Sequence, residues 1–240
     1  EREQLINELT INNKDLKQFS YIISHNLKAP LSNLTGLLGL IEDTEISDPE
    51  LLELINGFSK STHLLNETIN DLVKIIVIKD STSIEREEVS ILEVFENVFN
   101  QLNFLINSNT PNLKIALEKC STLFINKSYL ESILLNLTTN SLKYRDPERP
   151  LKISITSKTE NEKSVLTFKD NGMGIDLNRH GEKIFGLYQR FHSHTDSKGL
   201  GLYLVKSQVE AMGGTITIES KVDLGTTFTL TFNKEEQNAQ

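Results

Sequence analysis

The first 43 residues alternate apolar and polar positions with the period of an amphipathic helix. A mostly apolar stripe recurs in steps of four and three residues, as in a coiled coil, through Leu5, Leu9, Asn12, Leu16, Phe19, Ile23, Asn26 and Pro30. His25 lies one position off this stripe, so we expect an accessible ring beside the interface. Pro30 cannot donate to the carbonyl of Asn26, which predicts a bend just after His25.

A second amphipathic helix is predicted to follow a short connection. Ser47 and Asp48 precede Pro49, which gives an N-cap followed by proline at the first helical position, and Glu50 lies in the first turn. Its apolar positions are Leu51, Ile55, Phe58, Leu65, Ile69, Leu72 and Ile76. One antiparallel hairpin cannot cover both apolar faces, so the pattern predicts a homodimer that forms a four-helix bundle.

The pattern changes to mixed helix and strand after a linker-like segment at 79–84. Helices are predicted at about 90–107, 127–144 and 200–212. Strands, several of them alternating apolar and polar positions, are predicted at Leu113–Leu117, Leu151–Ser157, Ser164–Lys169, Thr215–Glu219 and Thr226–Phe232. Runs of strands with segregated helices favour an α+β layer fold.

Composition narrows the class of protein. The 240 residues suffice for one large or two small domains, the net charge is −8, and no basic stripe is visible, which argues against nucleic acid as a partner. The single Cys120 excludes an internal disulfide and fits a reducing compartment. No signal peptide or membrane span is visible. Since the chain starts at Glu1 in mid-pattern, we expect a cytoplasmic piece of a longer protein with an upstream sensor or anchor.

One polar cluster lies on a predicted helix, in LLNLTTNSLKY at 134–144. Asn136 and Asn140 are four residues apart and share a face, with Lys143 and Tyr144 one turn on. Two amides and an ammonium could hold a metal–phosphate group. A merely polar outer helix face is the alternative.

Two glycine-rich clusters follow. DNGMG at 170–174 comes directly after a strand and combines a carboxylate with a tight turn. In SKGLGLYLVK at 197–206, Gly199 and Gly201 precede an apolar helix, whose N-terminus would present free N–H groups to phosphate. Alone, each could be an ordinary turn or cap.

Together these clusters and the histidine segment resemble the sensor histidine kinases of two-component systems. LLNLTTNSLKY is similar to the family's N box, DNGMG to its G1 box, IFGLYQRFH at 184–192 to its F box and KGLGLYLVK to its G2 box. GGTITIES and DLGTTFTLTF match its closing strands, so the resemblance covers nearly the whole chain. It implies a dimerisation and histidine-phosphotransfer hairpin at 1–80, then at 84–235 an α+β sandwich with a mixed sheet and helices on one face. That second domain would be the ATP-binding domain shared with Hsp90, DNA gyrase and MutL.

The resemblance also implies an activity and roles for residues. ATP with magnesium (Mg2+) would phosphorylate the histidine, and the phosphoryl group would pass to an aspartate of a response-regulator receiver domain. His25 would be the phosphoacceptor, with Asn26 beside it, and residues 175–198 would form a lid over the nucleotide. At the phosphate end of the implied nucleotide site, Asn140 would bind magnesium with Asn136 close to it, Lys143 and Arg190 would contact the phosphates (Arg190 the γ-phosphate), and Gly199, Leu200 and Gly201 would offer backbone N–H groups. At the base end, Asp170 would recognise the adenine amino group, Tyr144 would pack near adenine, and Gly172 and Gly174 would form a floor under the base. Phe185 and Phe191 would be hydrophobic anchors of the lid.

The chain departs from the family pattern in three places. Asn26 stands where an acid usually follows the phosphoacceptor, and Ala29 stands where a Thr or Asn often holds water for phosphatase action. Ser197 replaces a common glycine of the G2 box. The first two departures predict a poor phosphatase and slower autophosphorylation.

Single residues and the whole pattern also allow other interpretations. His192 and His194 could suggest zinc, but a solvated loop is the simpler interpretation. His63 on the second helix has no motif around it, and the charged run from Lys143 to Pro150 is interpreted, beyond its first two residues, as a solvated helix exit. An ATPase clamp would need a Glu where Asn136 stands, and a non-catalytic scaffold would usually lose the boxes. The sequence leaves open whether phosphorylation runs in cis or in trans.

Overall fold

The computed structural model describes residues 27–28, 30–41, 44, 46, 48–80, 84–102, 111–117, 120–187 and 199–233. The chain divides into two compact units after Asp80. The helix expected before residue 27 and the bend expected after His25 lie outside the described residues. So do these residues singled out in the sequence: His25, Asn26, Ala29, Arg190, Phe191, His192, His194 and Ser197.

The first unit is helical. Residues 30–41 are helical, and α2 spans Pro49–Asp80. Asp48 caps α2, because its Oδ1 accepts hydrogen bonds from the N–H groups of Glu50 at 3.0 Å and Leu51 at 3.4 Å. The predicted N-cap with proline at the first helical position is therefore confirmed.

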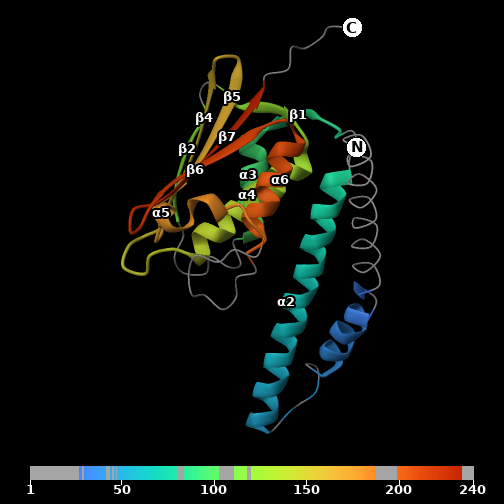
Figure 1. Cartoon of the computed structure of the whole chain (residues 1–240). Coiled ribbons are helices and arrows are strands. Elements are labelled where there is room, and N and C mark those ends of the chain that lie inside the picture. Colours follow the sequence, from blue (N-terminus) through green and yellow to red (C-terminus); the bar gives the residue numbers. More distant parts are fainter. Residues whose placement is uncertain are drawn as a thin grey trace, which may run out of the picture. The chain divides into compact units, whose positions relative to one another are not determined.

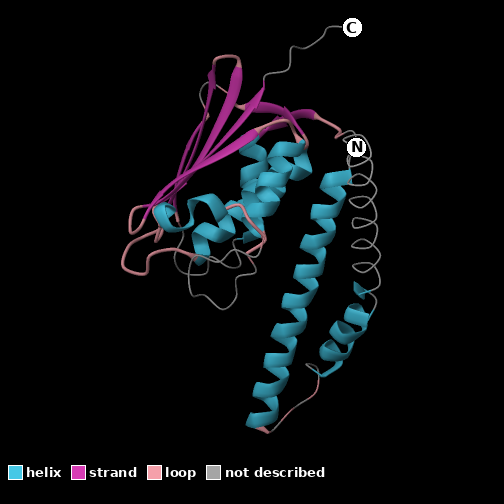
Figure 2. Ribbon diagram, in the orientation of Figure 1, coloured by secondary structure: helices cyan, strands magenta, loops and turns pink. Residues whose placement is uncertain are grey.

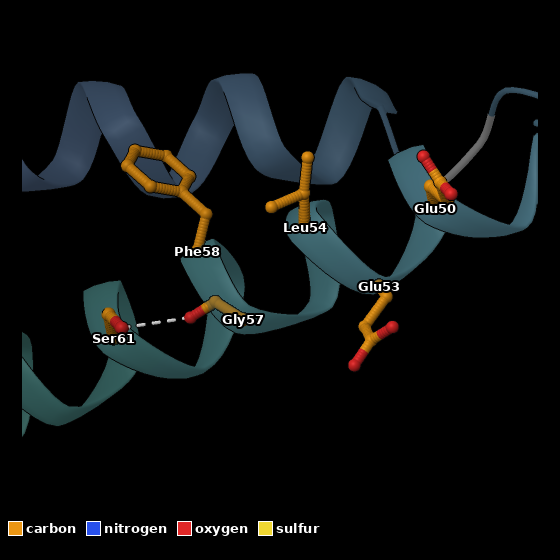
Figure 3. Close-up of a pocket in the computed structure, with 6 residues that line it drawn as sticks. All are labelled: Glu50, Glu53, Leu54, Gly57, Phe58 and Ser61. Carbon is orange, nitrogen blue, oxygen red and sulfur yellow. Dashed lines mark hydrogen bonds between the residues drawn. The ribbon is translucent and has the colours of Figure 1, made fainter.

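The apolar face of α2 is only partly covered. Ile69, Ile75 and Ile78 are buried, whereas Leu54 is 71% exposed and Phe58 is 52% exposed. Leu54 and Phe58 line a pocket and point to the same side, while Glu53 points away from them (Figure 3). An exposed aromatic and an exposed leucine on one helix face leave apolar surface that this chain alone does not bury.

The second unit is an α+β sandwich with a mixed sheet, as predicted (Figure 2). The five-stranded sheet has the order β2-β4-β5-β7-β6. The strands span Asn112–Ala116 (β2), Lys152–Glu160 (β4), Lys163–Asp170 (β5), Thr215–Lys221 (β6) and Gly225–Asn233 (β7). β2 and β4 are parallel, and the other neighbours are antiparallel.

Helices cover one face of this sheet (Figure 1). They are α3 (Ile91–Leu102), α4 (Lys127–Lys143) and α6 (Gly201–Ala211). Leu166, Phe168 and Leu230 of the sheet are fully buried, and they join helix residues such as Leu134 and Val205 in one core. Alternation on the strands and helical spacing on the helices therefore place one apolar face of each element in the same layer.

The structure adds two short strands that the pattern did not predict. β1 (Glu87–Ser90) pairs antiparallel with β3 (Thr122–Ile125) in a separate two-stranded sheet. Each has four residues, which is too short for alternation to separate a strand from a loop. A short helix α5 (Leu177–His180) and a 3-10 turn η2 (Gly181–Lys183) follow β5.

None of the helices in the part of the chain described by the structure combines the length and hydropathy needed to cross a membrane.

Candidate functional site

Asp170 is the last residue of β5 and its carboxylate is buried. Oδ1 accepts a hydrogen bond from the N–H of Gly172 at 2.8 Å, and Oδ2 accepts one from the Ser141 hydroxyl of α4 at 3.3 Å. Burial raises the pKa of the Asp170 carboxyl above its ordinary value, and hydrogen bonds from the N–H of Gly172, the hydroxyl of Ser141 and the N–H of Thr226 oppose that rise. The carboxylate is thus held in a fixed direction with little access to solvent.

Two glycines beside Asp170 allow backbone segments to approach closely. Gly174 has φ +66°, and a Cβ there would lie 2.0 Å from the carbonyl oxygen of Lys221. Gly225 has φ +104°, and a Cβ there would lie 2.2 Å from the carbonyl oxygen of Asp170. Both φ values favour glycine, so any side chain would push the β6–β7 turn away from the 170–174 loop.

Asn136 and Asn140 both lie on one helix, α4, as predicted, and both are half-buried. The Nδ2 of Asn136 donates to the carbonyl of Ser132 at 2.8 Å. Its Oδ1 faces the start of α6, because a Cβ on Gly201 would lie 2.8 Å from that oxygen. The N box and the G2 box, far apart in sequence, therefore meet here.

The N-terminus of α6 begins directly after a left-handed turn. Gly199 has φ +69°, and Leu200 is fully buried and accepts a helical hydrogen bond from the N–H of Leu204 at 2.9 Å. No side chain caps this helix end among the described residues. A helix N-terminus leaves its first N–H groups without intrahelical partners, and the helix dipole favours negative charge there.

Lys143 and Tyr144 end α4. The Lys143 ammonium lies 5.8 Å from the centroid of the Tyr144 ring. The carbonyl of Tyr144 accepts a hydrogen bond from the N–H of Met173 at 2.9 Å, and a Cβ on Gly172 would lie 2.6 Å from that same carbonyl oxygen. The end of the N box thus adjoins the loop that follows Asp170.

The structure brings together most of the nucleotide-site residues expected from sequence. One group joins Asp170 and its two loop glycines to Tyr144, and the other joins Asn136 to Gly201. Helix α4 connects the groups, since Ser141 touches Asp170 and Asn136 lies five residues earlier, roughly 7.5 Å along the axis. Of the expected lid anchors, Phe185 packs against the core, and Phe191 lies outside the described residues.

The interpretation of the charged run after Tyr144 as a solvated exit is wrong for Arg149. Its Nε donates to the carbonyl of Asn171 at 2.9 Å, and its Nη2 donates to the carbonyl of Gly172 at 2.8 Å. A run of charges beside a proline is the usual composition of a solvated loop. No local signal distinguishes Arg149, because its two partners lie 22 and 23 residues away in sequence.

Sequence reasoning also missed the serine that joins the closing hairpin to the 170–174 loop. The Ser220 hydroxyl accepts a hydrogen bond from the N–H of Ile175 at 2.8 Å and donates to the carbonyl of Gly225 at 3.0 Å. The Thr226 hydroxyl oxygen lies 2.9 Å from the Ser220 hydroxyl oxygen. These hydrogen bonds fix the β6–β7 turn, which Gly174 and Gly225 allow to approach the 170–174 loop. The 170–174 loop is therefore held on two sides.

The second unit matches a known family of domains. Residues 125–236 match the model of the histidine kinase-, DNA gyrase B-, and HSP90-like ATPase. This range contains both groups of site residues described above.

Similar proteins extend the likeness to nearly the whole chain. The methanogenesis regulatory histidine kinase FilI of Methanothrix harundinacea is 28% identical over 94% of this chain and 25% of its own length. The histidine protein kinase SaeS of Staphylococcus epidermidis is 28% identical over 88% of this chain and 62% of its own. The chain is therefore similar to sensor histidine kinases over most of its length. It spans between a quarter and less than two thirds of the length of these relatives.

Solved structures of histidine kinases share the fold. Full-length ShkA in complex with AMPPNP has a TM-score of 0.73 at 21% identity, covering 90% of this chain and 45% of that one. The histidine kinase AdeS of Acinetobacter baumannii has a TM-score of 0.62 at 20% identity, covering 88% of this chain and 98% of that one. Histidine kinases are ATP-dependent phosphotransferases, and this chain carries their ATP-binding fold.

Proposed function

We propose that this chain is the catalytic part of a two-component sensor kinase that phosphorylates itself on His25 from ATP and then passes the phosphoryl group to an aspartate of a receiver domain. The main support is the buried Asp170 carboxylate, fixed by Gly172 and by Ser141 on the same helix that carries Asn136 to the start of α6. A base-recognising carboxylate and an anion-binding helix end would thereby share one rigid frame.

The proposed nucleotide lies with its base at Asp170 and its phosphates at the start of α6. The carboxylate of Asp170 offers acceptors to an exocyclic amino group, which adenine has at its Watson–Crick edge and guanine presents at a different position. Gly199, Leu200 and Gly201 would offer backbone N–H groups to the phosphates. Lys143 and Arg190 would add positive charge at the phosphate end.

The donor set fits a magnesium ion. Magnesium binds hard oxygen ligands and usually keeps several waters when it holds nucleotide phosphates. The Oδ1 of Asn136 faces the start of α6, and the structure records no hydrogen bond between the side-chain amide of Asn140 and another described residue. Asn140 would hold the ion with Asn136 close to it, and the ion would offset the charge of the phosphates.

The chemical step is a transfer from oxygen to nitrogen. In its neutral form, the imidazole of His25 has a lone pair on one ring nitrogen. That lone pair forms the bond to the γ-phosphorus, and the bond from phosphorus to the oxygen bridging the β-phosphate breaks, which releases ADP. The other ring nitrogen keeps its proton. In the second step the N–P bond breaks as the receiver carboxylate forms an O–P bond.

The proposed homodimer accounts for the exposed apolar face of α2. Leu54 and Phe58 are among the most exposed apolar side chains of the described part of the first unit. A second copy of the same hairpin would bury them in a four-helix bundle. An upstream sensor domain in the full-length protein would act through this bundle.

A phosphorylation assay tests the proposal. The chain is incubated with magnesium and γ-labelled ATP, and the label is followed in wild type, in His25→Gln and in His63→Gln as a matched control on the exposed part of α2. We expect label that is stable to alkali and labile to acid in wild type and in His63→Gln, and none in His25→Gln. Label that persists in His25→Gln would refute the assignment of the acceptor. Phosphate release without protein label would indicate an ATPase instead.

A further inference from the structure

Arg149 binds the loop that follows Asp170. Its guanidinium uses two separate N–H donors, Nε to the carbonyl of Asn171 and Nη2 to the carbonyl of Gly172, at 2.9 and 2.8 Å. Nη2 also lies 3.3 Å from Oδ2 of Asp146, three residues earlier. A rigid planar fork with several donors can bind two consecutive carbonyls in this way, and a lysine ammonium cannot reproduce the geometry.

These contacts complete the hydrogen bonding of two consecutive peptide groups. In the first, the carbonyl of Asn171 is bound by Arg149 and the N–H of Gly172 by Oδ1 of Asp170. In the second, the carbonyl of Gly172 is bound by Arg149 and the N–H of Met173 by the carbonyl of Tyr144. Each peptide plane is fixed at both ends, and Arg149 supplies the partner of both carbonyls.

The segment that carries Arg149 is itself anchored to the same loop. The side chain of Asn171 accepts a hydrogen bond from the N–H of Lys152 at 2.6 Å and donates to the carbonyl of Pro150 at 3.1 Å. The loop is therefore bound to the start of β4 as well as to the guanidinium. Glycine at 172 has no Cβ to restrict rotation, so without the guanidinium its peptide groups would be freer to turn.

We propose that Arg149 is a positioning residue for base recognition. It holds the peptide groups on both sides of Gly172 in the orientation that keeps the Asp170 carboxylate aimed at the adenine amino group. Arg149 acts through the loop and does not touch the nucleotide. This inference rests on the proposed function, because it assigns Arg149 to the adenine end of that same site.

The consequence is an effect on base recognition that leaves the phosphate end intact. No hydrogen bond or ion pair joins Arg149 to Asn136 or Gly201 in the described part of the chain. Loss of the guanidinium should therefore weaken ATP binding and lower the preference for ATP over GTP. It should raise the KM for ATP in autophosphorylation more than it lowers kcat, because binding of the base is the same in the ground and transition states.

The test measures binding of ATP and GTP to the 240-residue chain by calorimetry in wild type, Arg149→Ala and Arg149→Lys. Arg145→Ala is the matched control, since Arg145 is an exposed arginine four residues earlier whose Nη1 donates to the carbonyl of Leu142 at 3.0 Å and not to the 170–174 loop. We expect Arg149→Ala to weaken ATP binding about tenfold and Arg149→Lys by a smaller factor, because the lysine keeps one charged donor. Arg145→Ala should stay within about twofold of wild type.

The outcomes separate this inference from the proposed function. If wild type binds no ATP, or binds it without preference over GTP, the proposed nucleotide site itself fails. If wild type prefers ATP and Arg149→Ala keeps the same affinity and the same preference, only the role of Arg149 is refuted. An equal loss for ATP and GTP, or the same loss in Arg145→Ala, would also overturn it by indicating a general structural effect. Should Arg149→Ala fail to fold, Arg149→Lys decides: an unchanged ATP-to-GTP ratio in that variant refutes the role, and a lowered ratio supports it.

Discussion

Asp170 combines a cost in stability with a proposed role in recognition. Its carboxylate is buried, so the charged form is penalised, and three hydrogen bonds only partly offset the penalty. Buried titratable groups of this kind cluster at functional sites. Ser141 and Gly172 are the neighbours that keep it oriented.

Replacing Asp170 by Asn should separate these two properties. The folded-state pKa lies above the ordinary value, so the folded protein binds the proton more tightly than the unfolded chain. The stability of wild type therefore falls as pH rises through the interval between the two values, with one pKa unit corresponding to about 1.4 kcal/mol. Asp170→Asn has no such loss, so its free energy of unfolding relative to wild type should increase as the pH rises above the ordinary pKa of 3.8, and should level off once the folded wild type has lost the proton.

Urea unfolding at several pH values checks this expectation, and ATP binding should be lost in the same variant. A difference in stability that does not change with pH would show that the Asp170 carboxyl has the same pKa in both states. Ser164→Ala is a control in the same strand, because it removes a buried hydroxyl and no titrating group.

Gly174 shows how the absence of a Cβ allows two backbone segments of the site to approach closely. Its φ of +66° and the 2.0 Å separation from the Lys221 carbonyl leave no room for a side chain. We expect Gly174→Ala to destabilise the second unit by about 2–4 kcal/mol, since it adds a backbone penalty to a clash with main chain. Gly181→Ala is the matched control, because the nearest atom to its Cβ would be 3.9 Å away. Thermal unfolding of both variants measures the difference, and equal melting temperatures would contradict the argument.

At the scale of elements, hydrogen bonds at the N-terminus of α4 fix the position of the helix face that carries Asn136 and Asn140. Oδ1 of Asn126 accepts from the N–H of Tyr129 at 3.0 Å, which is a standard N-cap bond. Nδ2 of the same side chain donates to the carbonyl of Glu85 at 3.0 Å. One residue thus caps the helix and connects it to the segment before β1.

Two substitutions at Asn126 should separate the contributions of these two hydrogen bonds to the stability of the protein. Asn126→Ala removes both and should lower the free energy of unfolding by about 1–2 kcal/mol. Asn126→Asp keeps the cap and the favourable charge at the helix N-terminus but loses the bond to Glu85, so we expect a smaller loss. Chemical denaturation gives both values. If Asn126→Asp were as destabilising as Asn126→Ala, the cap would contribute little to stability.

At the scale of the whole molecule, a single chain leaves part of its apolar surface exposed to solvent. Leu54 and Phe58 are exposed on the same side of α2, where they line a pocket. Phe19 and Ile23 of the stripe expected in the first helix lie outside the described residues, so α2 offers the more direct test of the proposed dimer.

The double variant Leu54→Glu with Phe58→Glu should convert the dimer to a monomer. Burying two carboxylates in a bundle core without partners costs several kcal/mol, roughly the free energy that separates a stable dimer from a weak one. Light scattering at micromolar concentration measures the mass. Leu92→Glu with Phe124→Glu is the control, because these exposed apolar residues belong to the second unit and should leave the dimer intact. A monomeric wild type would refute the bundle.

The elements of the second unit were largely predictable because their signals are local. Strands such as β6 and β7 alternate apolar and polar positions, and α4 and α6 start at asparagine or glycine signals that can be recognised in sequence. The strands β1 and β3 were not predicted, because four residues carry too little pattern. Their pairing joins segments far apart in the chain, such as Val89 and Leu123, which only the folded chain specifies.

The candidate site also has a part that the sequence predicts and a part that only the tertiary structure shows. The sequence by itself determined the chemical groups, since Asn136 and Asn140 share a helix face by spacing and Asp170 ends a strand before two glycines. Only the tertiary structure decided which groups touch: Oδ1 of Asn136 faces Gly201, and Ser141 binds Asp170. The physical reason is that helical and strand periods act over a few residues, whereas these contacts require packing of α4 against the sheet and α6. Arg149 had the composition of a solvated loop, and its two carbonyl partners were brought to it only by the pairing of β4 with β5.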